Sequence, residues 1–153
     1  MKDEDYYFFW GGIFSNWFLS PFTHKDVVFN CGEQMMMWEK AMLMGDIETA
    51  NEILHTVSPK EVKQLGRQVR NFNQGLWDVY KYNLVKEGLR SKFSQNPKLR
   101  SELKKREGRV FVEASPWDRI WGIGFSVENA LKNKNRWGEN LLGKILTELS
   151  KEI

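Results

Sequence analysis

The residues best suited to chemistry lie in a methionine-rich segment, where a carboxylate and an amine, Glu33 and Lys40, share one predicted helix. At 100° per residue, one narrow face of this helix carries Glu33, Met37, Lys40 and Met44. The opposite face is apolar and carries Met35, Trp38 and Met42. A helix that is apolar on two sides is expected to be central and buried. Burial lowers the pKa of a lysine, and a neutral Lys40 amine is a nucleophile suited to carbonyl-like carbons.

The spacing of Glu33 and Lys40 leaves two interpretations open. Seven residues correspond to roughly 10 Å along a helix axis, which is too far for a direct ion pair but leaves room for a ligand that touches both. In the other interpretation, Lys40 extends to solvent and Glu33 only complements the positive end of the helix. The spacing alone does not decide between them.

A second segment of chemical interest places Asp118 between two tryptophans, Trp117 and Trp121. A carboxylate beside such stacking surfaces can have a perturbed pKa and act in proton transfer. In the alternative interpretation, Ser115 or Asp118 caps a turn and both rings fill the core. This segment also contains Gly122, whose pattern is too short to predict a dinucleotide-binding turn.

Several common kinds of site are not predicted. His24, His55 and Cys31 have no further ligands at metal-binding spacing, so we expect no metal and no cofactor. The sequence has no glycine-rich phosphate loop and no nucleophile elbow.

Length and composition favour one globular domain over residues 1–153. Of the residues, 41% are hydrophobic and 28% are charged, and the formal net charge is +3. No apolar run is long enough for a membrane span, and the acidic N-terminus is unlike a secretory signal. Together with the single cysteine, this predicts a cytoplasmic protein. The aromatic share of 14%, with 7 tryptophans, fits either a packed core or stacking on a flat ligand.

Local signals predict a mainly α fold with minor β structure: a few short strands near the N-terminus and around residue 111. Strands are expected at 6–10, 26–29 and 109–113. Helices are expected at 31–44, capped by Asn30 and ended by Gly45, and at 47–55, capped by Asp46. A third helix starts at Ser58 and Pro59, and a long one covers 76–93 with a face of Trp77, Tyr80, Leu84, Val85, Gly88 and Leu89. A further helix is expected from Asn96–Pro97 to near Gly108, and the last two open at Ser126 and near Gly138.

Several ordered motifs resemble the NADAR, or YbiA-like, family over most of the chain. They are Phe14-Ser15-Asn16-Trp17 with Ser20-Pro21-Phe22, then Phe29 with Glu33-Gln34, Met36 and Lys40-Ala41, then Gly66-Arg67, the Trp77 to Lys92-Phe93 helix, and Leu99 with Leu103. The most specific are Glu113-Ala114-Ser115-Pro116 with Asp118, Trp121-Gly122 and Gly124, followed by Trp137-Gly138, Asn140, Leu142-Gly143 and Leu146.

The resemblance implies a single YbiA-like helical domain and N-glycosidic chemistry on ribose. Members are described as N-glycosidases of early riboflavin-pathway intermediates and as hydrolases that remove ADP-ribose from guanine bases, and the domain is linked to NAD and ADP-ribose metabolism. The implied partner is a phosphoribosyl or ADP-ribosyl small molecule, or ADP-ribosylated DNA or RNA, without a membrane. The implied catalytic residues are Lys40, Glu33 and Asp118. The implied substrate-binding residues are Ser15, Asn16, Trp17, Gln34, Arg67, Trp77, Lys92, Trp117, Trp121, Gly122 and Asn140.

Two mechanisms and two other functions remain open. In the first mechanism, Lys40 forms a Schiff base with the opened sugar while Glu33 and Asp118 transfer protons. In the second, the carboxylates stabilise an oxocarbenium ion and Lys40 binds phosphate. Arg67 and Lys92 are the other candidates for phosphate contact. A non-catalytic module that binds ADP-ribose or nucleotides is the alternative function. A nucleic-acid-binding accessory protein ranks last, because basic and acidic residues are interspersed.

Overall fold

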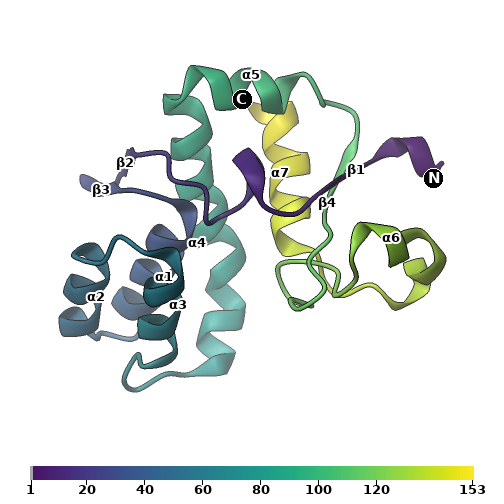
Figure 1. Ribbon diagram of the computed structural model, residues 1–153. Helices are drawn as coiled ribbons and strands as arrows, with labels where there is room; N and C mark the ends of the chain where they lie inside the picture. The colour runs from purple at the N-terminus through teal and green to yellow at the C-terminus, as the bar shows by residue number, and fades with distance from the viewer. Residues whose placement is uncertain (1) are drawn as a thin grey trace. The chain divides into compact units, whose positions relative to one another are not determined.

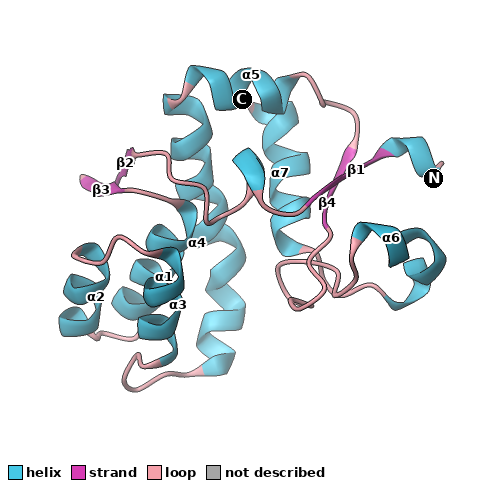
Figure 2. Cartoon of the chain, viewed as in Figure 1, coloured by secondary structure: helices cyan, strands magenta, loops and turns pink. Residues whose placement is uncertain are grey.

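A computed structural model of the chain describes residues 2–153, and helices dominate it (Figures 1 and 2). The expected class, mainly helical with a few short strands, is confirmed. The chain forms two compact units. We call residues 16–96 the central unit, and the residues up to 15 together with those from 97 onward the terminal unit. That residues 1–153 form one domain remains a prediction.

The central unit packs three helices around the methionine-rich one. Its elements are β2 (Phe22–His24), β3 (Val27–Phe29), α1 (Gly32–Leu43), α2 (Ile47–Leu54), α3 (Pro59–Arg67) and α4 (Gln74–Gln95). Helix α1 contacts α2, α3 and α4, which explains why its sequence is apolar on two sides. Asp46 accepts a hydrogen bond from the Thr49 N–H, and Ser58 accepts one from the Glu61 N–H, so both predicted caps are present.

Two glycines let α1 approach its neighbours closely. A Cβ atom on Gly66 of α3 would lie 2.0 Å from the sulfur of Met37, and one on Gly88 of α4 would lie 2.4 Å from the sulfur of Met35. Because no side chain separates the helices at these points, the methionines fill the space themselves. The position of α1 therefore depends on both glycines.

The terminal unit joins its N-terminal and C-terminal segments through a parallel strand pair. Its elements are η1 (Asp3–Asp5), β1 (Tyr6–Phe9), η2 (Gly12–Phe14), α5 (Pro97–Lys104), β4 (Val110–Glu113), α6 (Val127–Ala130), η3 (Leu131–Arg136) and α7 (Leu141–Glu152). Strand β1 pairs with β4 from Tyr6–Val110 to Phe9–Glu113, and α7 packs against β4. Its core includes the buried residues Val112, Ala114, Ile123 and Ala130.

Three local predictions are wrong, and one strand was missed. The N-cap of α1 is Cys31 instead of Asn30, whose backbone N–H donates to Gln34 Oε1. Tyr80 is 48% exposed, because the buried face of α4 passes through Lys81. Helix α5 ends at Lys104, well before Gly108. Strand β2, which forms an antiparallel hairpin with β3, was not predicted.

Candidate active site

Helix α1 places Glu33 in its first turn and Lys40 near its last turn. Glu33 is buried with 4% exposure, whereas Lys40 is half-buried. Glu33 lies close enough to favour the charged form of Lys40 electrostatically. The prediction that the amine and the carboxylate share one face of a buried helix therefore agrees with the structure.

The environment of Lys40 makes its neutral form more accessible than in an exposed lysine. Burial is the largest effect and lowers the pKa of the Lys40 ammonium from its ordinary value. The negative charge of Glu33 raises this pKa and the positive charge of Arg67, at the end of α3, lowers it. The ring of Phe72 also faces the amine, with the Lys40 Nζ atom 4.6 Å from the ring centroid. Lys40 is thus a lysine with an increased neutral fraction beside one carboxylate.

Glu33 is held in place by the segment that precedes the β2–β3 hairpin. The indole Nε1 of Trp17 donates a hydrogen bond to Glu33 Oε1 at 3.0 Å. The backbone N–H of Glu33 donates to the carbonyl of Asn16 at 2.8 Å. Asn16 is buried and lies against Gly32, where a Cβ atom would meet its Oδ1 at 2.5 Å. Asn16 and Trp17 therefore both lie at the N-terminal end of α1.

Three other predicted binding residues of the central unit are buried. Gln34 is buried, and its Nε2 donates to the carbonyls of Ile53 and Thr56, which ties α1 to the end of α2. Trp77 is buried in α4. Lys92 has no exposed surface, and burial lowers its pKa to about 8. Such a buried ammonium is better suited to an internal role than to a phosphate contact at the surface.

Asp118 belongs to the terminal unit, where it holds a tight turn. Its Oδ1 accepts hydrogen bonds from the backbone N–H groups of Ile120 at 2.8 Å and Trp121 at 2.9 Å. The hydroxyl of Ser115 accepts from the Asp118 N–H at 3.3 Å. The interpretation that Ser115 and Asp118 cap a turn is therefore correct. A catalytic role for Asp118 remains a prediction, since one carboxylate can both cap a turn and transfer a proton.

Asn140 and Gly122 hold together the end of β4 and the start of α7. Asn140 has a left-handed backbone with φ of 53°, and its side chain accepts from the Glu113 N–H at 3.0 Å and donates to the Phe111 carbonyl at 3.0 Å. A Cβ atom on Gly122 would lie 2.9 Å from the Glu113 carbonyl oxygen. The first N–H groups of α7 donate to the carbonyls of residues 120–122, which satisfies donors that a helix start leaves open.

The remaining predicted residues of the terminal unit lie nearer the surface. Trp117 is 84% exposed, so the interpretation that its ring fills the core is wrong. Trp121 and Ser15 are half-buried. A ring as exposed as Trp117 can stack on a flat ligand.

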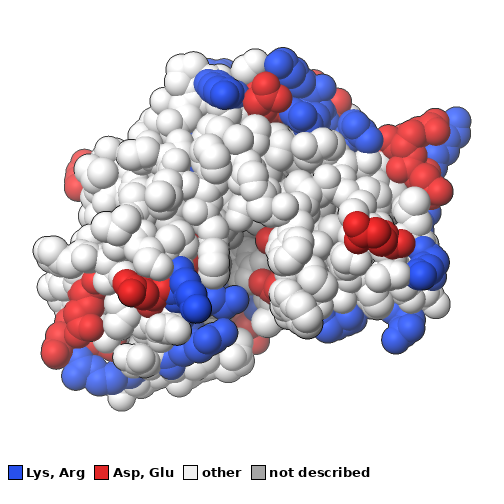
Figure 3. Space-filling view, viewed as in Figure 1, with Lys and Arg blue, Asp and Glu red and all other residues white. Residues whose placement is uncertain are grey.

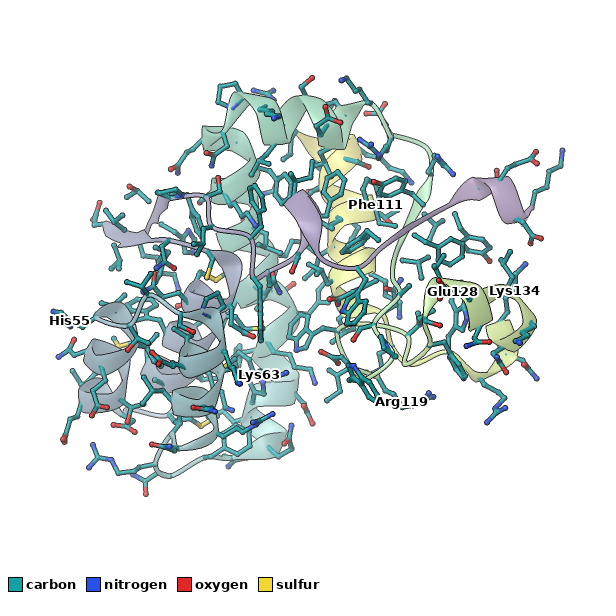
Figure 4. The ribbon with its side chains drawn as sticks, viewed as in Figure 1. His55, Lys63, Phe111, Arg119, Glu128 and Lys134 are labelled. Atoms are coloured by element: carbon teal, nitrogen blue, oxygen red, sulfur yellow. The ribbon has the colours of Figure 1, made fainter. Side chains whose placement is uncertain are left out.

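The described residues give no sign of a metal site or of a membrane span. No group of three or more His, Cys, Asp or Glu residues among residues 2–153 could hold a metal ion. His55 lies at the C-terminal end of α2 (Figure 4). Within the same residues, no helix is both long enough and apolar enough to cross a bilayer. The face in Figure 3 is mostly uncharged, and both basic and acidic side chains occur on it in small groups.

Phe72 is a neighbour of Lys40 that sequence reasoning missed. It lies in the loop between α3 and α4, where no helical period applies, so its contact with α1 has no sequence signal.

Comparison with known proteins gives consistent matches. The sequence profile of the NADAR domain matches residues 8–153. The chain is 40% identical to an N-glycosidase of Acanthamoeba polyphaga mimivirus, over 99% of this chain and 98% of that protein. It is 33% identical to a chloroplastic riboflavin biosynthesis protein of Zea mays, over 69% of this chain and 16% of that protein. The NMR structure of the E. coli protein YbiA matches with a TM-score of 0.79 and 25% identity, over 96% and 83% of the two chains.

Proposed function

The chain belongs to the NADAR domain family, and we propose that it is an N-glycosidase that hydrolyses the bond between ribose C1 and a base nitrogen. The observation that carries this proposal is the half-buried Lys40 amine, placed two turns from the buried Glu33 carboxylate on one helix. The name of the mimivirus relative supports the class of reaction. Cys31 is a buried free thiol, which fits the proposed cytoplasmic location.

The lowered pKa of Lys40 favours covalent catalysis through a Schiff base. The sugar ring opens when the C1–O bond breaks and the ring oxygen takes a proton, which leaves an iminium between C1 and the base nitrogen. The neutral Lys40 amine adds to C1, and the base nitrogen leaves with a proton. A Schiff base between Lys40 and C1 remains. Water adds to C1, and the Lys40 amine is expelled, so one water molecule cleaves the C1–N bond overall.

Carboxylates move the protons in this scheme. Glu33 is proposed as one proton carrier, because it is buried and its charge reaches Lys40. Asp118 is proposed as the second carboxylate. In the non-covalent alternative, both carboxylates stabilise an oxocarbenium ion and Lys40 binds phosphate.

We propose that the substrate is ADP-ribosylated guanine, in a nucleotide or nucleic acid, or a phosphoribosyl intermediate of riboflavin synthesis. Both carry a ribose C1–N bond and a phosphate. The name of the maize relative supports the second. Arg67, which is exposed and close enough to influence Lys40, is the proposed phosphate contact, and Trp117 and Trp121 are proposed to stack on the base.

Product analysis tests the proposal directly. The full chain is incubated with an ADP-ribosylated guanine oligonucleotide, the early riboflavin intermediates and NAD, and released base and ribose are measured by chromatography and mass spectrometry. We expect release from at least one substrate, and none from Lys40→Ala. Binding of ADP-ribose without release from any substrate would instead support the non-catalytic module.

A further inference from the structure

An aromatic ring covers the amine that the proposed reaction uses. The Lys40 Nζ atom lies 4.6 Å from the centroid of the Phe72 ring, within the range of a cation–π contact. Phe72 is 40% exposed, so its ring is not there to fill the core. The contact joins α1 to a loop residue far away in sequence, which requires the loop to be held in place.

The loop that carries Phe72 is anchored on both sides to the short connection between α1 and α2. On one side, the Arg70 N–H donates to Asp46 Oδ2 at 2.9 Å, and its guanidinium donates to Asp46 Oδ1 at 2.8 Å. On the other side, the Asn73 N–H donates to the Met44 sulfur at 3.3 Å. Met44 lies one helical turn after Lys40. The two anchors therefore fix Phe72 beside Lys40.

Backbone and cap geometry strengthen the second anchor. Asn71 has φ of 58°, a left-handed conformation that asparagine adopts more readily than most residues. The Asn73 side chain accepts from the Leu76 N–H at 3.0 Å and caps α4. The chain reverses at Asn71 and is locked again at Asn73, so Phe72 has little freedom to move away.

We propose that Phe72 is a positioning residue for Lys40: its ring fixes the end of the flexible side chain and keeps water from one side of the amine. This inference rests on the proposed function, in which Lys40 is the reacting group. A lysine side chain has many rotamers, and holding it near one geometry lowers the entropy lost when it attacks a carbon.

A ring and an aliphatic cover differ in a measurable way. Both exclude water, but only the ring has a negative face that favours the ammonium form. Replacing the ring by an aliphatic side chain therefore lowers the pKa of Lys40 further. The charged groups that act on the pKa of Lys40 are Glu33 on α1, which raises it, and Arg67 on α3, which lowers it.

The test compares Phe72→Leu, which keeps an apolar cover, with Phe72→Tyr, which keeps the ring. The full chain carries lysine labelled with ¹³C at Cε, and the Lys40 signal is identified by its loss in Lys40→Arg. In Phe72→Leu we expect the titration midpoint of Lys40 to fall by about half a pH unit. In Phe72→Tyr we expect the midpoint of the wild type.

Turnover supplies the second readout. Phe72→Leu is expected to lower turnover about fivefold because the amine is less well positioned, while Phe72→Tyr retains it. Thermal unfolding is measured as a control and is expected to show that the partly exposed site tolerates leucine. Phe72→Met gives the same comparison if leucine disturbs the turn.

The outcomes separate the two claims. If the wild type has turnover and Phe72→Leu changes neither the midpoint nor the rate, this inference alone is overturned. If the wild type has no turnover on any substrate, the proposed function is overturned.

Discussion

The indole Nε1 of Trp17 donates to Glu33 Oε1 at 3.0 Å, although the Trp17 ring itself is 44% exposed. Trp17→Phe removes this donor and keeps a ring. A hydrogen bond to a charged group contributes about 1.5–3 kcal/mol, so turnover is expected to fall by at least about tenfold. The melting temperature should stay close to that of the wild type because the ring is partly exposed.

Trp10→Phe is the matched control, since Trp10 is an exposed tryptophan of the terminal unit. It should leave steady-state kinetics unchanged. Equal kinetics for Trp17→Phe and the wild type would mean that the hydrogen bond does not orient a reacting carboxylate.

Asp118→Asn separates charge from turn capping. An asparagine keeps the Oδ1 acceptor for the N–H groups of Ile120 and Trp121, so the melting temperature should not change. If the carboxylate transfers protons, turnover falls about 10²-fold, on the scale of general acid–base catalysis. Normal turnover in Asp118→Asn would leave Asp118 with the capping role alone.

Gly88→Ala tests the close packing of α1 on α4. A Cβ atom there would overlap the Met35 side chain, and such overpacking is expected to cost about 1–2 kcal/mol of unfolding free energy. Gly75, in the first turn of the same helix, has only ordinary contact at that position, so Gly75→Ala should be neutral or slightly stabilising. Urea unfolding measures both, and equal effects would contradict the packing argument.

Asp46 is expected to make stability depend on pH. The hydrogen bonds from Arg70 hold the pKa of the Asp46 carboxyl well below its usual range. Since the folded-state pKa is depressed, the stabilisation is present above the unfolded-state pKa of about 4 and is lost as the pH falls toward the folded-state value. Asp46→Asn should therefore lower the melting temperature by a few degrees at pH 7.

Thermal unfolding of the wild type and Asp46→Asn from pH 7 to pH 2 measures this effect. The difference between the wild type and Asp46→Asn should shrink as the pH falls below about 4. A difference that stays constant with pH would show that charge on Asp46 does not contribute.

The predictable part of the fold is the part that local chemistry determines. Asp46 and Ser58 begin helices through their own side chains, so sequence alone locates them. The pairing of β1 with β4 joins segments far apart in the sequence, and no local pattern specifies it. Strand β2 is only three residues long, and the Gln95 side chain bonds to the backbone of Thr23 in both directions. No local sequence pattern predicts such support from a distant side chain.

Part of the candidate site can likewise be predicted from the sequence, and part of it cannot. Glu33 and Lys40 share a helix face, which helical periodicity predicts. Gln34 and Asn140 were predicted to bind substrate, yet their polar atoms bond to backbone groups of the protein. A polar residue in a motif can thus serve the fold, and only its partners reveal this. Phe72 reaches Lys40 through tertiary structure alone.

We propose that the Lys40 amine forms a covalent Schiff base with ribose C1. Borohydride reduces such a bond to a stable secondary amine, so the measurement is the mass of the Lys40 peptide after incubation with substrate and borohydride. We expect an added sugar-sized mass on that peptide. Both the added mass and turnover should be lost in Lys40→Arg, because a guanidinium stays protonated and cannot attack. No added mass in the wild type, with turnover that survives in Lys40→Ala but not in Glu33→Gln, would contradict the covalent route and favour the oxocarbenium route.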